Sequence, residues 1–219
     1  MQEKTVENYL KTIYHLSSSG SLMVTNKQLA TRMEVIPATI TETLRKLNEM
    51  RLVDYEKSYG ARLTPKGLKQ ALAIVRRHRI WETYLAQELG FGWDEVHEIA
   101  EELEHVVNEK LILRLHQKIG EPMFDPHGDP IPDEKGKIQK MEFIKLSDCK
   151  AGRSYVFCGV SDHSASFLNY LDRNKLKIGN RVEVLERESF DGSVLVKRGD
   201  GKIQLSLQIA MNMLLRTKD

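Results

Sequence analysis

The sequence predicts a mainly α-helical protein with a β-rich C-terminal part. Three observations support this fold class. Apolar residues recur at helical spacing through most of the first 119 residues. Four of the six prolines then fall within residues 121–136, which indicates a loop or a linker. From about residue 140 onward, apolar and polar residues alternate in short runs, as they do in half-buried strands.

Three helices are predicted in the first 50 residues. Residues 5–17 place their apolar side chains three and four positions apart. Thr25 and Gln28 form the pattern of a capping box, so a short helix should cover residues 26–33. Pro37, a favoured first residue of a helix, should open the third.

A two-stranded ribbon should follow these helices, because residues 52–64 alternate in polarity and turn around Tyr59 and Gly60. Helix, short turn, helix and ribbon is the order of a winged helix-turn-helix, a DNA-binding fold. Residues 1–79 carry 14 Lys and Arg against 7 Asp and Glu, a net charge of +7 that suits a polyanion. The alternative is an ordinary three-helix domain that contacts other proteins.

Small hydroxyl and basic side chains should face outward from the helix that begins at Pro37, and Thr43 is expected among them. Threonine can reach base edges or thymine methyls, whereas Lys and Arg anchor phosphates. Two basic residues of the ribbon should touch the DNA backbone beside the groove. The candidate DNA-binding residues are Thr25, Lys27, Pro37, Thr39, Thr41, Arg45, Lys46, Lys57 and Arg62.

Two longer helices are predicted next, over residues 65–89 and from Asp94 to about Ile119. At about 100° per residue, four polar side chains of the second helix fall at roughly 0°, 40°, 340° and 80° around its axis. They are His97, Glu101, Glu104 and His105. Two imidazoles and two carboxylates on one helix face form half of a divalent metal site. His78 and Glu82, one turn apart upstream, offer the other half.

The charge of the middle segment agrees with cation binding. Residues 80–136 carry 4 Lys and Arg against 14 Asp and Glu, a net −10, whereas residues 137–219 carry 15 against 10, a net +5. The alternative is that these charges are scattered over solvated faces. Cys149 and Cys158 are too few for a disulfide framework and are expected to be small core residues. Without a signal-peptide pattern or an apolar run of membrane length, the expected location is the cytoplasm.

The C-terminal part should contain four strands and one helix. The predicted strands are Arg153–Val160, Arg181–Arg187, Ser193–Lys197 and Lys202–Leu207. The helix is expected over Ser164–Leu176.

Five segments together resemble the diphtheria-toxin-repressor and manganese-transport-regulator family of metal-dependent repressors, and the resemblance spans nearly the whole chain. They are ENYLKTIYHL (7–16), RRHRIWETYL (76–85), VHEIAEELEHVVNEKL (96–111), DPHGDPIP (125–132) and VSDHSASFLNYLDRNKLKIGNRVEVLERESFDGS (160–193). The ligand-bearing helix and the Asp-Pro-His-Gly-x-Pro-Ile-Pro loop are specific in combination.

The resemblance implies that His78, Glu101, Glu104 and His105 are ligands of the activating metal site. Asn8 stands where manganese-type members have aspartate and iron-type members have methionine, and its carbonyl oxygen is able to ligate. Glu101 stands where iron-type members have cysteine. A carboxylate there favours a harder ion, so Mn²⁺ is the first choice of metal and Fe²⁺ the second.

A second, ancillary metal site is also implied by the resemblance. Glu82 and His97 match positions near it, and Asp125 and His127 of the proline-rich loop fit as ligands. The C-terminal domain donates one further ligand in long family members. In this sequence that ligand is either Asp162 or His163, and Ser-Asp-His-Ser is equally able to cap the helix that follows.

These observations lead to a three-domain interpretation: a winged helix-turn-helix DNA-binding domain (1–73), a helical metal-binding and dimerisation domain (74–140) and an SH3-like barrel (141–219). The protein is expected to be a homodimeric repressor that binds double-stranded operator DNA with Mn²⁺ or Fe²⁺ and no membrane. Six apolar residues are candidates for the dimer face or, alternatively, for the core: Leu85, Leu89, Phe91, Trp93, Leu111 and Leu115.

Two other classes compete with this interpretation. A metal-dependent hydrolase would use the same carboxylates and histidines to activate water, but the sequence has no HExxH pattern and no evident oxyanion site. The other class is a metal-binding scaffold that carries a winged helix. DNA affinity that rises with metal separates the repressor from both.

Overall fold

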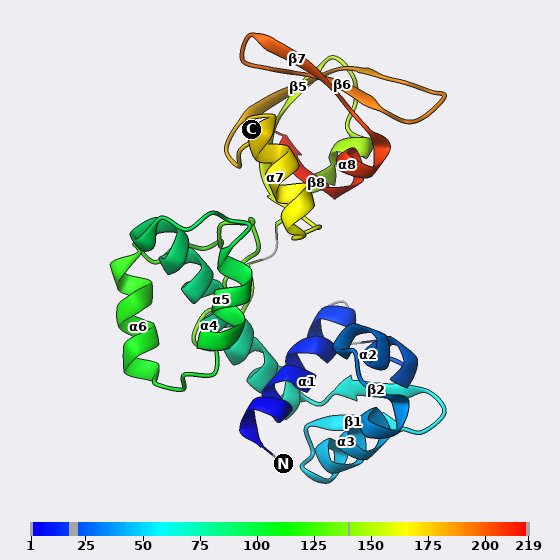
Figure 1. The fold of residues 1–219 in the computed structure, drawn as a ribbon, viewed down its shortest axis with the longest axis vertical. Coiled ribbons are helices and arrows are strands. Elements are labelled where there is room, and N and C mark those ends of the chain that lie inside the picture. The colour runs from blue at the N-terminus through cyan, green and yellow to red at the C-terminus, as the bar shows by residue number, and fades with distance from the viewer. Residues whose placement is uncertain (1, 18–21, 140, 218–219) are drawn as a thin grey trace. The chain divides into compact units, whose positions relative to one another are not determined.

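The computed structural model describes residues 2–17, 22–139 and 141–217 (Figure 1). Residue 140, the expected boundary of the last domain, lies outside these ranges. The chain forms two compact units. The first unit consists of Met1–His78, Glu101–Ile112 and Pro132–Ile138, and the second of Arg79–Ala100, Leu113–Ile131 and Gln139–Asp219.

The first unit contains the predicted winged helix-turn-helix. Its elements are α1 (Glu3–Leu16), α2 (Asn26–Met33), α3 (Pro37–Glu49), β1 (Val53–Glu56) and β2 (Gly60–Leu63). The capping box is confirmed: the Gln28 N–H donates to Thr25 Oγ1 at 3.3 Å, and the Thr25 N–H donates to Gln28 Oε1 at 2.9 Å. The two strands pair antiparallel, with Val53 opposite Leu63.

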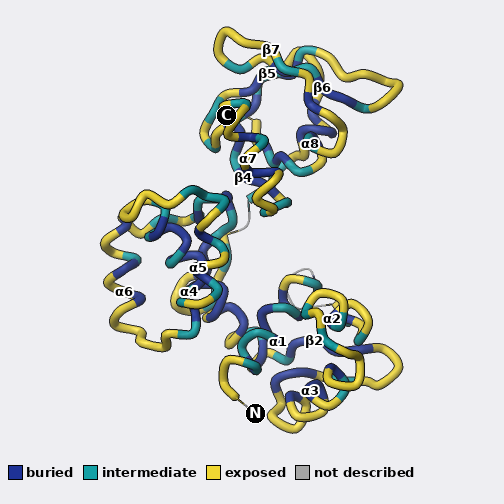
Figure 2. Tube along the Cα trace, in the orientation of Figure 1, coloured by how far each residue is buried: buried dark blue, intermediate teal, exposed yellow. Residues whose placement is uncertain are grey.

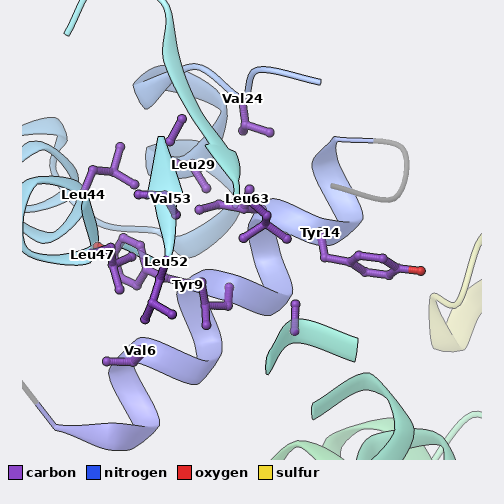
Figure 3. Packing of buried hydrophobic residues seen from close by; sticks show 14 of the residues in the cluster. Val6, Tyr9, Tyr14, Val24, Leu29, Leu44, Leu47, Leu52, Val53 and Leu63 are labelled. Carbon is purple, nitrogen blue, oxygen red and sulfur yellow. The ribbon is translucent and has the colours of Figure 1, made fainter. Parts of the chain in front are cut away.

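One hydrophobic core holds these elements together. Figure 3 shows side chains from α1, α2, α3 and both ribbon strands gathered in a single cluster. Leu10, Ile13, Leu29, Leu44 and Leu47 have no exposed surface. Each such side chain contributes about 1.5–3 kcal/mol through burial, so the apolar spacing of the three helices accounts for their packing.

Gly60 lets the ribbon lie against the segment before α2. The Val24 N–H donates to Ala61 O at 2.8 Å, and the Ala61 N–H donates to Val24 O at 2.9 Å. Gly60 has φ +107°, and a Cβ at this position would lie 2.1 Å from Val24 O. Only glycine fits this close backbone approach without a shift of the ribbon.

Helix α4 (Pro65–Leu89) has the predicted bounds, but the single helix expected to Ile119 is wrong. The structure has α5 (Val96–Leu103) and α6 (Glu109–Lys118) instead. Asn108 starts the new helix, since its Oδ1 accepts the Leu111 N–H at 3.0 Å. Val106 and Val107, which follow the last turn of α5, are 41% and 59% exposed. Glu104 and His105 therefore lie in the turn after α5.

The C-terminal part of the second unit is a six-stranded sheet with the order β3-β8-β4-β5-β6-β7. Buried and half-buried residues alternate along two of its strands, and Figure 2 shows the sheet domain coloured by burial. Four strands correspond to the predicted ones: β4 (Arg153–Val160), β5 (Arg181–Arg187), β6 (Val194–Arg198) and β7 (Gly201–Leu205). The expected helix is α7 (Ala165–Arg173).

The elements of this sheet domain that were not predicted include β3 (Ile144–Lys145), the short 3-10 helix η1 (Leu146–Asp148), α8 (Leu207–Asn212) and β8 (Met213–Thr217). Leu207 was expected to end a strand, but it begins α8 because Ser206 Oγ accepts the Ile209 N–H at 3.3 Å. Strand β8 lies between β3 and β4 and so completes the sheet. No helix in the described ranges is long and apolar enough to cross a membrane.

Replacing Gly60 of the first unit by alanine should destabilise the protein more than the same change at Gly120 of the second unit. Both residues have positive φ, which costs roughly 1–2 kcal/mol for a residue with a Cβ. Only Gly60 adds a backbone clash, whereas nothing lies within 4 Å of a Cβ at Gly120. Urea unfolding of the two variants measures the difference, and equal losses would contradict the role given to the bridge between Val24 and Ala61.

Candidate metal centres and nucleic-acid interface

Glu104 is the most deeply buried acidic residue of the first unit, with no exposed surface. His78 Nδ1 lies 2.6 Å from Glu104 Oε2. Lys11 Nζ donates to both carboxylate oxygens of Glu104, at 2.7 and 2.6 Å, and to Glu101 Oε1 at 2.6 Å. Helix α1, helix α4 and the end of α5 thus meet at one carboxylate.

A second link to α1 runs through Glu7. His105 Nδ1 lies 2.6 Å from Glu7 Oε2, and Arg77 Nη2 donates to Glu7 Oε1. Arg77 Nε also donates to the Glu104 carbonyl oxygen at 2.6 Å. These contacts fix the non-helical turn that carries Glu104 and His105.

Two buried ligand atoms, one on α1 and one in this turn, lack a hydrogen-bond partner. They are Asn8 Oδ1 and His105 Nε2, and none is found for either in the parts of the chain that the structure describes. His105 Nε2 lies 3.8 Å from Glu104 Oε1. A buried amide oxygen without a partner is rare, and it fits a cation or an ordered water.

We call Asn8, His78, Glu101, Glu104 and His105 the first-unit cluster. It offers oxygen from an amide and two carboxylates and nitrogen from two imidazoles. This donor set suits Mn²⁺ or Fe²⁺, so the residues present fit a divalent metal.

The second unit holds another group of potential ligands, on α4 and the proline-rich loop. Ligand atoms of Glu82, Asp125 and His127 lie within 4.8 Å of one another, and all three residues are buried. His127 Nδ1 is 3.7 Å from Glu82 Oε2. His97 Nδ1 is 3.1 Å from Glu82 Oε1, which places His97 at the edge of the group.

Protonation in this group is shifted by burial and by crowding of like charges. Burial and the nearby carboxylate of Glu82 raise the pKa of Asp125 to about 8, against the opposing effect of Arg79. Burial lowers the pKa of His127, but the hydrogen bond and charge of Glu82 outweigh it and raise the pKa to about 9. The negative potential that holds a proton on His127 also favours a bound cation.

His163 and Asp162 take different places in the second unit. The His163 ring stacks on that of His127 at a centroid distance of 4.7 Å, and His163 Nε2 lies 3.7 Å from Asp129 Oδ2. Nε2 of His163 is buried and has no hydrogen-bond partner among the described residues, and burial lowers the pKa of this imidazole. Asp162 Oδ1 accepts the Ser164 N–H at 2.9 Å just before α7. We call Glu82, Asp125, His127 and His163 the second-unit cluster.

The backbone of the proline-rich loop is held in place around His127. Asp125 Oδ1 accepts the His127 N–H at 2.8 Å, and the Val160 N–H of β4 donates to His127 O at 3.0 Å. Gly128 has φ +88°, and a Cβ there would lie 2.1 Å from Cys158 O. His127 Nε2 lies 2.6 Å from Trp93 O. The loop therefore presents His127 rigidly against the sheet domain.

The residues expected to contact DNA are mostly exposed. The exposed ones are Thr25, Lys27, Pro37, Thr39, Arg45, Lys46, Lys57 and Arg62. Lys46 Nζ pairs with Glu42 at 2.6 Å, and Arg62 Nε pairs with Asp54 at 3.1 Å. Both are surface pairs, which contribute little and are readily exchanged for phosphates.

Two threonines of α3 differ from the expected outward arrangement. Thr43 is 8% exposed and belongs to the inner face of the helix, next to the fully buried Leu44, so its expected orientation is wrong. Thr41 is half-buried: its hydroxyl donates to Pro37 O at 3.1 Å and accepts from Asn26 Nδ2 at 3.0 Å. The Thr41 hydroxyl is thus engaged within the domain.

The sequence did not predict that five further charged residues lie around the two clusters: Glu7, Lys11, Arg77, Arg79 and Asp129. Glu7 and Lys11 lie four positions apart on α1, a spacing that marks a shared polar face. Asp129 lies four residues after Asp125, and Arg79 Nη2 is 3.3 Å from its carboxylate. The cysteines are free, and burial raises the pKa of Cys149 to about 11, as fits a core thiol.

Three protein-family models match consecutive parts of the chain. Residues 1–61 match the iron dependent repressor N-terminal DNA binding domain. Residues 64–133 match the iron dependent repressor metal binding and dimerisation domain. Residues 144–217 match the FeoA domain.

Solved structures and curated proteins give the same relationship. A manganese-dependent transcriptional repressor in complex with manganese is 36% identical with a TM-score of 0.87, covering 97% of this chain and 100% of that chain. ScaR with bound Cd²⁺ is 32% identical with a TM-score of 0.80, and the match covers 97% of this chain and 99% of the ScaR chain. The iron-dependent repressor IdeR of Mycobacterium leprae is 34% identical over 128 residues, which are 58% of this chain and 55% of that protein. The chain thus spans little more than half the length of this curated relative.

Proposed function

This chain belongs to the family of metal-dependent transcriptional repressors that includes the diphtheria toxin repressor and the iron-dependent repressors, and we propose that it binds operator DNA as a homodimer when a divalent metal is bound. The family is one of transcription regulators and not of enzymes. In this proposal residues 1–73 bind DNA, residues 74–140 bind metal and hold the dimer, and residues 141–219 form a regulatory SH3-like domain in the cytoplasmic protein.

The observation that carries the proposal is the position of the first-unit cluster. Asn8 lies on α1, within the helical domain that also carries α3, whereas His78 lies on α4 and Glu104 follows α5. A bound divalent ion would supply positive charge for the buried carboxylates and bonds that join these segments. The chain's own residues would hold α1 in a defined orientation, and two recognition helices of a dimer must be oriented together to enter successive major grooves.

Mn²⁺ is the metal that the first-unit cluster favours, with Fe²⁺ as the second choice. Three of its five side chains offer oxygen, and no thiol is among them. Hard oxygen ligands suit Mn²⁺, whereas softer thiolates suit Zn²⁺ and copper. Zn²⁺ can still bind tightly, because affinity in most sites follows the Irving–Williams order.

Three of the apolar candidates for dimer contacts are exposed. Leu89 and Phe91 of the second unit and Leu111 of the first are 56%, 38% and 37% exposed and are therefore available to a partner chain. Leu85 and Leu115 are 3% and 8% exposed and belong to the core of the chain. Trp93 donates its indole N–H to Asp172 at 2.9 Å.

The second-unit cluster is proposed as an ancillary metal site. Glu82, Asp125, His127 and His163 are its ligands, with His97 and Asp129 at the edge. The bare imidazole nitrogen of His163 favours this residue over Asp162, whose carboxylate holds the turn before α7. Since His163 precedes α7 and His127 lies on the loop, a metal there would tie the sheet domain to α4.

Mn²⁺ should raise the affinity of the parent protein for DNA at least a hundredfold. Glu104→Gln should abolish this increase, because the neutral amide is a poor replacement for an anionic metal ligand. Operator sequences are first selected from a random duplex library in Mn²⁺, and their affinity is then compared in Mn²⁺ and in chelator at fixed salt. Glu102→Gln is the matched control, since Glu102 is exposed. Equal affinity of the parent in chelator and in Mn²⁺ would contradict the proposal.

His127→Ala should lower the metal content by one ion per chain while most of the activation of DNA binding remains. The reason is that His127 belongs to the second-unit cluster alone. Metal content after dialysis against limiting Mn²⁺ measures the effect. His15→Ala removes an exposed imidazole from α1 and serves as the control. Unchanged metal content in His127→Ala would leave the loop with a structural role only.

A further inference from the structure

Lys11 is a buried lysine whose charged end reaches the centre of the first-unit cluster. It is 7% exposed and projects from α1. Its ammonium donates to Glu101 Oε1 and to both oxygens of Glu104, all at 2.6–2.7 Å. Lysine is almost never buried unless it is paired, so these three contacts are what hold its charge inside the protein.

The oxygens that Lys11 contacts belong to the two carboxylates proposed as metal ligands. An ammonium and a metal ion both need the lone pairs of these oxygens. A divalent cation on the same carboxylates would also lie within a few ångströms of the ammonium, beside the fully buried Glu104 and the partly exposed Glu101, and like charges that close repel one another. The two cations therefore compete for these oxygens.

From these contacts we infer that Lys11 is an internal competitor of the activating metal. Its ammonium neutralises Glu101 and Glu104 before metal arrives, and it must withdraw for the metal to bind. Lys11 thereby sets the metal concentration at which the protein responds. This inference rests on the function proposed for the same cluster.

The charges around the cluster agree with an exchange of cations. Arg77 contacts Glu7 and the Glu104 carbonyl oxygen, whereas the Lys11 ammonium contacts the carboxylate oxygens that are proposed as ligands. Glu7, Glu101 and Glu104 carry three negative charges, and Arg77 with Lys11 carries two positive ones. A divalent ion in place of Lys11 brings this group to neutrality, whereas both cations together leave an excess positive charge.

With or without metal, α1 stays linked to the Glu104 carboxylate. In the metal-free protein the Lys11 ammonium makes this link, and in the metal-bound protein the metal makes it. The lysine stem is flexible, and its ammonium is strongly hydrated once it reaches water. If the site must first release its own cation, its apparent affinity for metal equals the intrinsic affinity multiplied by the fraction of molecules in which the ammonium has left the carboxylates. The result is a higher threshold for every divalent ion.

Lys11→Met should therefore bind Mn²⁺ at least ten times more tightly than the parent. Affinity is measured by competition with a fluorescent chelator at fixed ionic strength. Lys4→Met is the matched control, because it removes the same charge from an exposed position on the same helix. Its affinity should stay within about twofold of the parent. An unchanged or weaker affinity of Lys11→Met would overturn the inference.

Glu104→Gln in the same titration separates the two possible failures. If the parent and Glu104→Gln bind Mn²⁺ alike, the metal does not use this cluster and the proposed function fails with the inference. If Glu104→Gln loses the site while Lys11→Met matches the parent, only the inference on Lys11 fails.

Amine labelling tests the same inference on the unmodified chain, whether or not Lys11→Met folds. The protein is treated briefly with an acetylating reagent in chelator or in saturating Mn²⁺, and each lysine is quantified by mass spectrometry. Acetylation of Lys11 should rise several-fold with Mn²⁺, while Lys4 serves as the internal reference. Equal protection of Lys11 in both conditions would overturn the inference.

Discussion

A carboxylate removed from water requires a cation, and the first unit is organised around Glu104, which has no exposed surface. Removing one partner of such a buried pair typically costs about 3–5 kcal/mol, so the segments that supply its partners are held together. Lys11 comes from α1, His78 from α4, and Arg77 binds the carbonyl of the same residue. The orientation of the DNA-binding helices is thus tied to the ionic state of one turn.

The second unit applies the same constraint in a different way. Its carboxylates are covered by Arg79 and by the proton on His127, whose pKa is raised to about 9. The loop that carries Asp125 and His127 is pinned to β4 by the contact of Gly128 with Cys158 and by the hydrogen bond from Val160. Histidines and carboxylates of α4, the loop and the segment before α7 therefore form a compact group whose members belong to separate parts of the sequence.

Local patterns predicted the first three helices well, because all three have one apolar face and two of them, α2 and α3, also carry a start signal. The capping box at Thr25 and the apolar spacing of α3 are examples. The end of α5 at Leu103 was not predicted. The apolar spacing continues past it, and the sequence does not reveal that the side chains of Val106 and Val107 stay largely exposed in the folded chain. Strand β8 was missed because its pairing with β3 and β4 depends on distant residues. The ligand types were predicted, but Lys11 was not: a lysine on a helix normally faces water, and only the folded chain brings it to Glu104.

Crystals of the protein grown with Mn²⁺ would show directly whether a cation at Glu104 links α1 to the turn after α5. Anomalous scattering at the manganese edge locates the ion independently of any assumption about its ligands. We expect an anomalous peak for a manganese ion that is bonded to Glu101 and Glu104 and in contact with Asn8. The Lys11 ammonium should be withdrawn from both carboxylates. A structure with manganese bound only at other residues, and with the bridge from Lys11 to Glu104 intact, would contradict it.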